Sequence, residues 1–358
     1  MSRTRKKGFV KESKMMICKR FQHKKAFFSK KGGRDFLETS TVKSIKKTNM
    51  IENNTNKLKK NLRLMKKHWQ FYIIILPSVL YIFIFKYLPI VGMQMAFRDY
   101  NVRDGMWGSE WVGFKYFINF FNSPVFWDIF GNTLEISIMT LIIGFPVPII
   151  LALILNEIRG GFFKKFSQTI TLAPHFISVV VMAGMVILFL HPTNGMFAKF
   201  FDLFGMEPVN YLSSATGFKY IYALSETWQH AGYASIIYLA ALAGINPELY
   251  EAAKMDGASR FQKVLHIDIP GISLVITIML ILQIGELTSV GFEKVLLLQN
   301  PMNIPGSEVI ATYVYQVGLV NANYSFGTAI GLFNSVINFI LLVSVNSIAR
   351  RISGNSLW

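Results

Sequence analysis

A glutamate and a histidine stand one helical turn apart in an otherwise apolar part of the chain. Glu226 and His230 are four residues apart, so a helix would carry both on one face. A carboxylate and an imidazole can act together as general acid and base. The sequence offers no nucleophile motif, no metal-ligand cluster and no G-x-x-x-x-G-K-[ST] phosphate loop beside them. The pattern therefore does not favour an enzyme, and the chain is not expected to bind ATP itself.

More polar residues fall at a similar depth in the same apolar segments. The candidates for a polar path are Glu226, Trp228, His230, Tyr233, Gln283 and Glu286. Ionisable and amide groups are costly in lipid, so they should face a cavity or one another. A cavity lined by aromatic rings, amides and carboxylates would suit a sugar. A network that satisfies itself between helices, without a ligand, is an equal alternative.

The last apolar segment carries small and amide residues along one helical face. Gly327, Gly331, Asn334 and Asn338 recur at i, i+4, i+7 and i+11. Small residues allow helix backbones to approach closely, and asparagines hydrogen-bond between helices. Packing explains this face better than a transport path does, but Asn334 and Asn338 are kept as candidates for the path.

These residues would be positioned by membrane-spanning helices. The composition, with 52% hydrophobic and 16% charged residues, is typical of a polytopic membrane protein. Six segments approach the length of about 20 residues that a spanning helix needs. They are Phe71–Ile90, Thr133–Leu155, Ile170–Leu190, Tyr220–Ala243, Ile272–Val290 and Phe326–Ile348. The sequence therefore predicts an all-α membrane protein with six transmembrane helices.

The positive charge is concentrated before the first span. Residues 1–70 hold 22 of the 37 Lys and Arg residues and only four acids. We expect residues 1–69 to be a largely disordered cytoplasmic tail that contacts anionic lipid rather than nucleic acid, and residues 70–358 to form the membrane domain. The positive-inside rule places both termini in the cytoplasm of a multi-pass protein in the bacterial cytoplasmic membrane. Residues 91–129 would lie outside, as an aromatic belt or a docking surface for an external protein.

A polar stretch between two apolar segments has the signals of an ordered helical hairpin. Asn246 can cap a helix that begins at Pro247, and Gly257 can take the left-handed conformation that ends it. Ser259 and Gln262 form the start signal of a second short helix. A membrane protein with such a structured loop, over residues 246–270, offers it to a soluble partner.

The residues of this loop resemble the EAA loop of the permease subunits of ATP-binding cassette (ABC) importers. The resemblance rests on the positions Glu251, Ala252, Ala253, Asp256, Gly257, Ala258, Ile267, Ile269 and Pro270. It implies a type I importer fold in which this loop forms coupling helices that dock on a cytoplasmic ATPase. Of these positions Glu251, Ala252, Ala253, Asp256, Gly257, Ala258, Ile267 and Pro270 would carry the coupling.

Segments outside the loop resemble the carbohydrate-uptake branch, and within it the LplB-like oligosaccharide permeases. They include residues 85–101, 144–157, 168–178 and 291–303. The resemblance implies a heterodimer with a second permease, two ABC ATPase subunits, an extracellular solute-binding lipoprotein and an oligosaccharide substrate. ATP and Mg would be bound by the ATPase, with no cofactor and no metal in this chain.

Two other functions compete with sugar import. A permease for a non-sugar solute would share the coupling loop and differ in its cavity. A membrane-embedded enzyme of glycan synthesis would need acidic or metal-binding motifs at the membrane face, and the sequence shows none.

Overall fold

The described residues are helical nearly throughout, as the sequence predicts. The computed structural model describes residues 67–158, 160–205, 210–354 and 356–357. The chain divides into two units, Met1–Phe85 and Lys86–Trp358, which are considered separately. The predicted tail, residues 1–69, lies outside the described residues up to position 66. The all-α class is confirmed.

The first described elements are a helical run, a small hairpin and a short helix. They are α3 (Trp69–Ile82), the π-helix η1 (Phe83–Tyr87), α4 (Leu88–Gly92), the 3-10 helix η2 (Met93–Phe97), β1 (Arg98–Asp99), α5 (Gly105–Gly108), β2 (Glu110–Trp111) and α6 (Lys115–Phe121). Strands β1 and β2 pair antiparallel, with Arg98 opposite Trp111. The Arg98 side chain donates to the Ser109 carbonyl at 2.9 Å, which fastens the hairpin loop.

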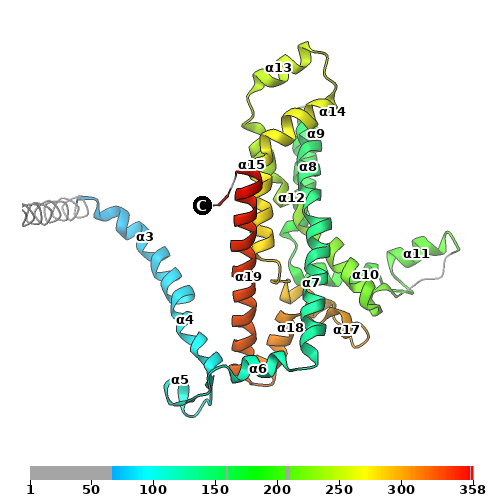
Figure 1. Cartoon of the computed structure of the whole chain (residues 1–358). Coiled ribbons are helices and arrows are strands. Elements are labelled where there is room, and N and C mark those ends of the chain that lie inside the picture. The colour runs from blue at the N-terminus through cyan, green and yellow to red at the C-terminus, as the bar shows by residue number, and fades with distance from the viewer. Residues whose placement is uncertain (1–66, 159, 206–209, 355, 358) are drawn as a thin grey trace, which may run out of the picture. The chain divides into compact units, whose positions relative to one another are not determined.

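The rest of the second unit is a set of long helices joined by short ones. The next elements are α7 (Val125–Gly144), α8 (Pro146–Glu157), α9 (Phe162–Leu172), η3 (Ala173–Phe176), α10 (Val179–Phe189), α11 (Met196–Asp202), η4 (Tyr211–Ser213) and α12 (Ala215–Ala243). The last are α13 (Pro247–Met255), α14 (Arg260–Lys263), η5 (Val264–Asp268), α15 (Ile269–Gly285), α16 (Phe292–Leu298), α17 (Ile304–Ser307), α18 (Ile310–Val314), η6 (Tyr315–Val320) and α19 (Tyr324–Ser353). In Figure 1, α13 and α14 form one end of this unit, and α6 and α17 lie at the other. We call the end with α13 and α14 the loop end.

Four helical runs are long and apolar enough to cross a membrane. Among the described residues they are Trp69–Phe97, Val125–Glu157, Arg260–Gly285 and Tyr324–Arg351. They correspond to the first, second, fifth and sixth predicted spans. Helix α12 has 29 residues and is long enough for the fourth predicted span. Its polar residues lower its mean hydropathy, so it is not among these four runs. The predicted count of six is therefore not fully confirmed.

The third predicted span, Ile170–Leu190, is not one straight helix. The helical run Phe162–Phe176 and helix α10 meet at an angle of 98°. Pro174 lies in the 3-10 turn η3 and has no backbone N–H to continue an α-helix. Ile177 is then extended, and the Ser178 side chain accepts from the Val181 N–H, which caps a new helix. The segment is a broken span or a re-entrant loop.

The fifth predicted span, Ile272–Val290, is shifted along the chain. Its helix continues back without interruption through η5 to Arg260 and ends at Gly285. Residues 286–290 turn away from the helix axis and lead into α16. The prediction of its outer boundary at Val290 was wrong because the apolar residues after Glu286 pack inward in a turn, where Val290 is buried.

Two hydrophobic clusters hold α12 at its two ends. Near its start, Phe218 and Tyr222 pack with buried residues of α7, α10 and α16. Near its end, Tyr238 and Leu242 pack with Ala152 of α8 and with α15. The middle of α12, which carries Glu226 and His230, lies between these clusters, so it is held firmly while its polar side chains face the space beside it.

Candidate functional site

The predicted caps of the polar loop are present. The Asn246 side chain accepts from the Glu248 N–H at 3.1 Å and starts α13. Gly257 has a φ of +76°, the left-handed conformation that closes the helix. Ser259 and Gln262 form a capping box, with each side chain accepting from the other residue's N–H. The second short helix differs from the prediction, because α14 continues through η5 into the spanning helix α15.

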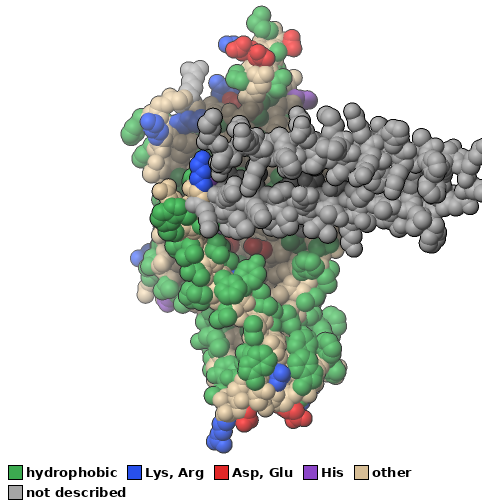
Figure 2. Space-filling model, turned by 90° about the vertical axis from the view of Figure 1, so that its left-hand side faces the viewer, with side chains coloured by type: hydrophobic (Ala, Val, Ile, Leu, Met, Phe, Trp, Pro, Cys, Tyr) green, Lys and Arg blue, Asp and Glu red, His purple; other side chains and the backbone are tan. Residues whose placement is uncertain are grey.

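The tip of this loop is open to solvent and mixes charged with apolar side chains. Figure 2 shows acidic and basic side chains together at the loop end. Two large apolar side chains of the loop, Met255 and Phe261, are 87% and 74% exposed. Glu251, Ala252, Asp256, Gly257 and Pro270 are exposed, and Ala253, Ala258 and Ile267 are half-buried. This surface is available to a partner.

The base of the loop makes one buried hydrogen bond, beside the start of α15, and one exposed ion pair with α8. The Tyr250 hydroxyl of α13 donates to the buried carboxylate of Asp268 at 2.5 Å, just before α15 begins. Arg260 of α14 lies 4.0 Å from the Glu157 carboxylate at the end of α8. Burial raises the pKa of the Tyr250 hydroxyl, and the bond to Asp268 raises it further, so Tyr250 stays a proton donor at neutral pH. The loop is therefore joined to α15 covalently and to α8 by an ion pair.

A cavity that is lined by apolar and polar side chains together lies beside the middle of α12. One chamber of about 510 Å³ is bounded by α7 and α8, α12 and α15, and a neighbouring one of about 230 Å³ extends toward Gly291. Glu226, Gln283 and Glu286 line both chambers, and His230 lines the larger. The structure thus brings together four of the candidates, two from α12 and two from the end of α15.

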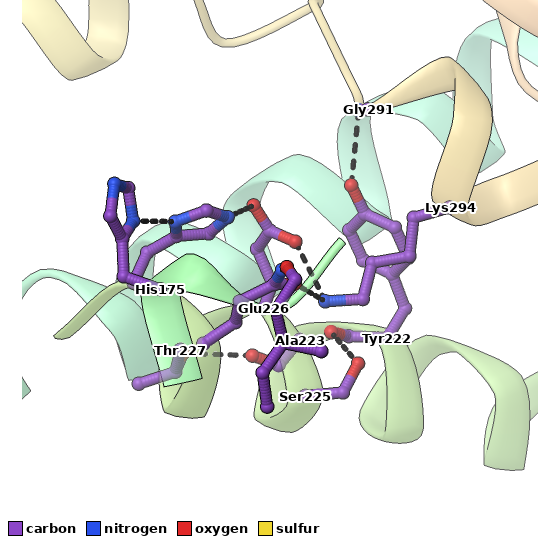
Figure 3. Close-up of polar contacts among 11 residues, drawn as sticks. His175, Tyr222, Ala223, Ser225, Glu226, Thr227, Gly291 and Lys294 are labelled. Atoms are coloured by element: carbon purple, nitrogen blue, oxygen red, sulfur yellow. Dashed lines mark hydrogen bonds and ion pairs between the residues drawn. The ribbon is translucent and has the colours of Figure 1, made fainter. Parts of the chain in front are cut away.

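A buried lysine completes the polar network at this cavity. The Lys294 Nζ of α16 is 2.9 Å from Glu226 Oε2 and 3.1 Å from Gln229 Oε1, and the residue is only 3% exposed. Figure 3 shows Lys294 reaching the Glu226 carboxylate, with the Tyr222 hydroxyl accepting from the Gly291 N–H alongside. His230 Nε2 lies 3.3 Å from the other oxygen of Glu226. This carboxylate is therefore held in one orientation at the cavity wall.

Several predicted residues do not face the cavity. Trp228 lines a separate apolar pocket between α10, α11 and α12. Tyr233 stacks on His175, with ring centroids 4.1 Å apart. Asn338 accepts from the Thr288 N–H and hydroxyl, which ties α19 to the turn after α15. Asn334 has a buried side-chain oxygen that bonds to none of the described residues. Packing accounts for Asn338.

Three residues in or beside the cavity were not predicted from the sequence: Lys294 contacts Glu226 from behind the wall, and Ser137 and Thr140 line the smaller chamber. Lys294 directly follows Glu293, a pattern typical of an exposed charge pair, but it shares a helical face with the buried Leu298, and that spacing could have revealed it. Sequence reasoning gave no role to Ser137 and Thr140, which belong to α7. No group of three or more His, Cys, Asp or Glu side chains is placed to hold a metal ion in the described part of the chain.

The chain matches a known family over more than half its length. Residues 144–354 match the family described as "Binding-protein-dependent transport system inner membrane component". It is 42% identical over 287 residues to the polygalacturonan/rhamnogalacturonan transport system permease protein YteP of Bacillus subtilis, covering 80% of this chain and 89% of that protein. The chain is 40% identical over 294 residues to protein LplB of the same organism, and this match covers 82% of this chain and 92% of that protein.

Comparison with solved structures also finds a transporter of this kind. The chain is similar to a chain of a bacterial ABC transporter involved in the import of the acidic polysaccharide alginate, with a TM-score of 0.75 and 38% identity. The match covers 82% of this chain and 99% of that one. It is equally similar to a chain of the bacterial alginate ABC transporter in complex with an alginate pentasaccharide-bound periplasmic protein.

Proposed function

Because this chain belongs to the family of binding-protein-dependent transport system inner membrane components, we propose that it is the permease subunit of an importer for polysaccharide-derived oligosaccharides. It is an ABC transporter permease rather than an enzyme. The named substrates of its relatives are polygalacturonan, rhamnogalacturonan and alginate, all of them polysaccharides. The observation that carries the sugar assignment is the cavity at the middle of α12.

The chemistry of the cavity suits an oligosaccharide. Glu226 and Glu286 offer carboxylates that accept hydrogen bonds from sugar hydroxyls, and Gln283 both donates and accepts. Phe145 and Tyr238 also line the larger chamber and supply apolar surface for a sugar face. Lys294 and His230 hold the Glu226 carboxylate in place, so that it meets the ligand without reorganising.

The loop over residues 246–270 is the part that couples the permease to its motor. Its exposed tip, with Met255 and Phe261, supports docking on an ATPase, since apolar side chains favour a protein interface over water. The uninterrupted helix from Arg260 to Gly285 connects this tip to the cavity wall that carries Gln283. A rigid connection of this kind can convert ATPase closure into a movement of the wall.

The assembly we infer contains a second permease, two ATPase subunits that bind ATP and Mg, and an extracellular solute-binding lipoprotein. An alginate-bound periplasmic protein in the related complex supports the last of these. The loop end faces the cytoplasm, together with both termini, because Arg350 and Arg351 end α19 there and the basic tail precedes α3. The permease lies in the bacterial cytoplasmic membrane.

Uptake by the reconstituted assembly tests the substrate class. Proteoliposomes that contain all subunits are given purified short oligogalacturonides and alginate oligosaccharides, and internal sugar is measured by mass spectrometry. We expect ATP-dependent uptake of at least one of them and a loss of about tenfold in Gln283→Ala, since a lost hydrogen bond of about 1.4 kcal/mol corresponds to that factor. Failure of the wild-type assembly to take up any of these sugars would reject the substrate assignment.

A backbone substitution tests the coupling loop separately. Proline cannot adopt the φ of +76° at Gly257 and removes its N–H, which bonds to the Lys254 carbonyl. Gly257→Pro should abolish sugar-stimulated ATP hydrolysis while the protein still inserts in the membrane. Gly205→Pro is the matched control, because Gly205 has a φ of +69° and its N–H bonds to the Asp202 carbonyl, away from the loop. Normal coupling in Gly257→Pro would exclude the loop as the connection.

A further inference from the structure

Two hydroxyl groups of α7 stand out because they are buried beside the cavity and have no partner in the part of the chain that the structure describes. The hydroxyl oxygens of Ser137 and Thr140 are buried and have no hydrogen-bond partner among the described residues. Ser137 is only 8% exposed. Both residues line the smaller chamber, and Thr140 also lines the larger one. They lie three positions apart, on one face of α7.

Several other hydroxyls in the described helices donate within their own helix. Thr133 in α7, one turn before Ser137, donates to the Ile129 carbonyl at 2.7 Å. Thr227 of α12 donates to the Ala223 carbonyl, and Thr277 of α15 donates to the Ser273 carbonyl. Such bonds to the fourth preceding carbonyl are the ordinary choice for a helical hydroxyl in an apolar setting. Ser137 and Thr140 do not make them, and a buried hydroxyl without a partner destabilises a fold.

The groups on the opposite wall of the cavity indicate what these hydroxyls can bind. The facing wall of both chambers carries Glu226, Gln283 and Glu286, and its two carboxylates only accept hydrogen bonds when ionised. A sugar also has acceptors, namely its ring and glycosidic oxygens and, in a uronic acid, a carboxylate. A hydroxyl on α7 can donate to these oxygens. The two walls would then bind opposite edges of one sugar unit.

We propose that Ser137 and Thr140 hydrogen-bond directly to the transported sugar and form the donor wall of its site. The proposal rests on the proposed function of the cavity and assigns it two contacts on a third helix. It predicts that both hydroxyls determine which sugar is held in the membrane domain, because their bonds depend on where its acceptor oxygens lie.

The test removes the hydroxyls without changing the shape of the site. Thr140→Val keeps the size of the side chain, and Ser137→Ala deletes one oxygen. Thr277→Val is the matched control, since it deletes a hydroxyl that bonds within its own helix and does not line the cavity. Each variant is reconstituted with the partner permease, the binding protein and an ATPase variant that binds but cannot hydrolyse ATP. Short oligogalacturonides and alginate oligosaccharides are the probes, and the sugar retained by the trapped complex is counted. The same permease variants, with the hydrolysing ATPase, give uptake rates.

We expect the double variant Ser137→Ala/Thr140→Val to retain about tenfold less sugar and to lose uptake in proportion. Its thermal stability in detergent should equal or exceed that of the wild type, because an unpaired buried hydroxyl is removed. Thr277→Val should retain sugar as the wild type does. Wild-type retention and uptake in the double variant, with uptake still lowered by Gln283→Ala, would overturn this proposal and leave the proposed function standing. A wild-type assembly that takes up no probe would overturn both.

Discussion

The buried ion pair at the cavity gives the sharpest prediction of stability. Lys294 bonds to Glu226 at 2.9 Å and to Gln229 at 3.1 Å, and its ammonium lies 5.9 Å from the centre of the Tyr222 ring. We consider Glu226→Gln, Lys294→Met and the double variant that carries both. The two single variants each leave one charge of the pair behind, and the double variant leaves none.

The expected costs follow from how well water can reach the remaining charge. Glu226→Gln leaves an ammonium on a residue that is 3% exposed, so it should cost about 3–5 kcal/mol. Lys294→Met leaves a carboxylate whose side chain is 29% exposed and still contacts His230, so it should cost about 2 kcal/mol. The double variant has no unpaired charge and should lie within about 1 kcal/mol of the wild type.

A double-mutant cycle measures this coupling. Unfolding of the detergent-purified protein is followed by titration with a denaturing detergent, under conditions where it refolds. Lys219→Met is the control, since it leaves behind only the carboxylate of Glu135, whose side chain is 64% exposed, and losing a partner of such an exposed charge costs less than about 1 kcal/mol. If the double variant were as unstable as the sum of the two single variants, the reasoning about charge burial at this site would be refuted.

Three further predictions concern other parts of the chain. Gly327→Ala should be strongly destabilising, because the added Cβ would lie 2.7 Å from the Cα of Gly318. At Gly331 an added Cβ meets no atom within 4 Å, so Gly331→Ala should be tolerated. Thermal unfolding of the two variants compares them directly. Tyr250→Phe leaves the buried carboxylate of Asp268 without its donor and should lower the free energy of unfolding by about 1.5–3 kcal/mol. It should lower sugar-stimulated ATP hydrolysis more than it lowers membrane insertion. Equal stimulation in variant and wild type would speak against a role of Tyr250 in coupling. Hydrogen bonds from Tyr116 and Lys115 lower the pKa of Asp99, so the stability it contributes is present above its unfolded-state pKa and is lost as pH falls through the folded-state value. Asp99→Asn should therefore lower the unfolding temperature at neutral pH by a small amount, with the difference from wild type vanishing in acid.

The features that could be predicted from sequence are those whose causes lie close together in the chain. The caps at Asn246 and at Ser259 with Gln262 depend on residues within three positions, and both are present. The depth of Glu226 and Gln283 could be counted along their spans, because a spanning helix has a fixed rise per residue. That count predicted a similar depth for the two residues, but it did not decide between a cavity and a network without a ligand.

The features that could not be predicted depend on contacts between distant residues or on local geometry that competes with hydropathy. Lys294 pairs with a residue 68 positions earlier, and its neighbour Glu293 made it look like part of a solvated surface pair. The bend after η3 was hidden because the segments before and after Pro174 and His175 are mostly apolar, so hydropathy continues where the helix does not. Ser137 and Thr140 looked like ordinary helical hydroxyls until their missing bonds could be seen.

Capture of the ATPase by the loop tests the central claim most directly. Cys18 is the single cysteine of the chain, so a Cys18→Ser background allows one reactive thiol to be placed at Ala252, which is exposed on α13, or at Val102, which is 70% exposed near the β1–β2 hairpin. A short bifunctional thiol reagent is then applied to membranes that contain the whole assembly. The account predicts a cross-link to the ATPase subunit from Ala252→Cys, changed in yield by ATP, and none from Val102→Cys. No cross-link from Ala252→Cys, or equal capture from both positions, would contradict it.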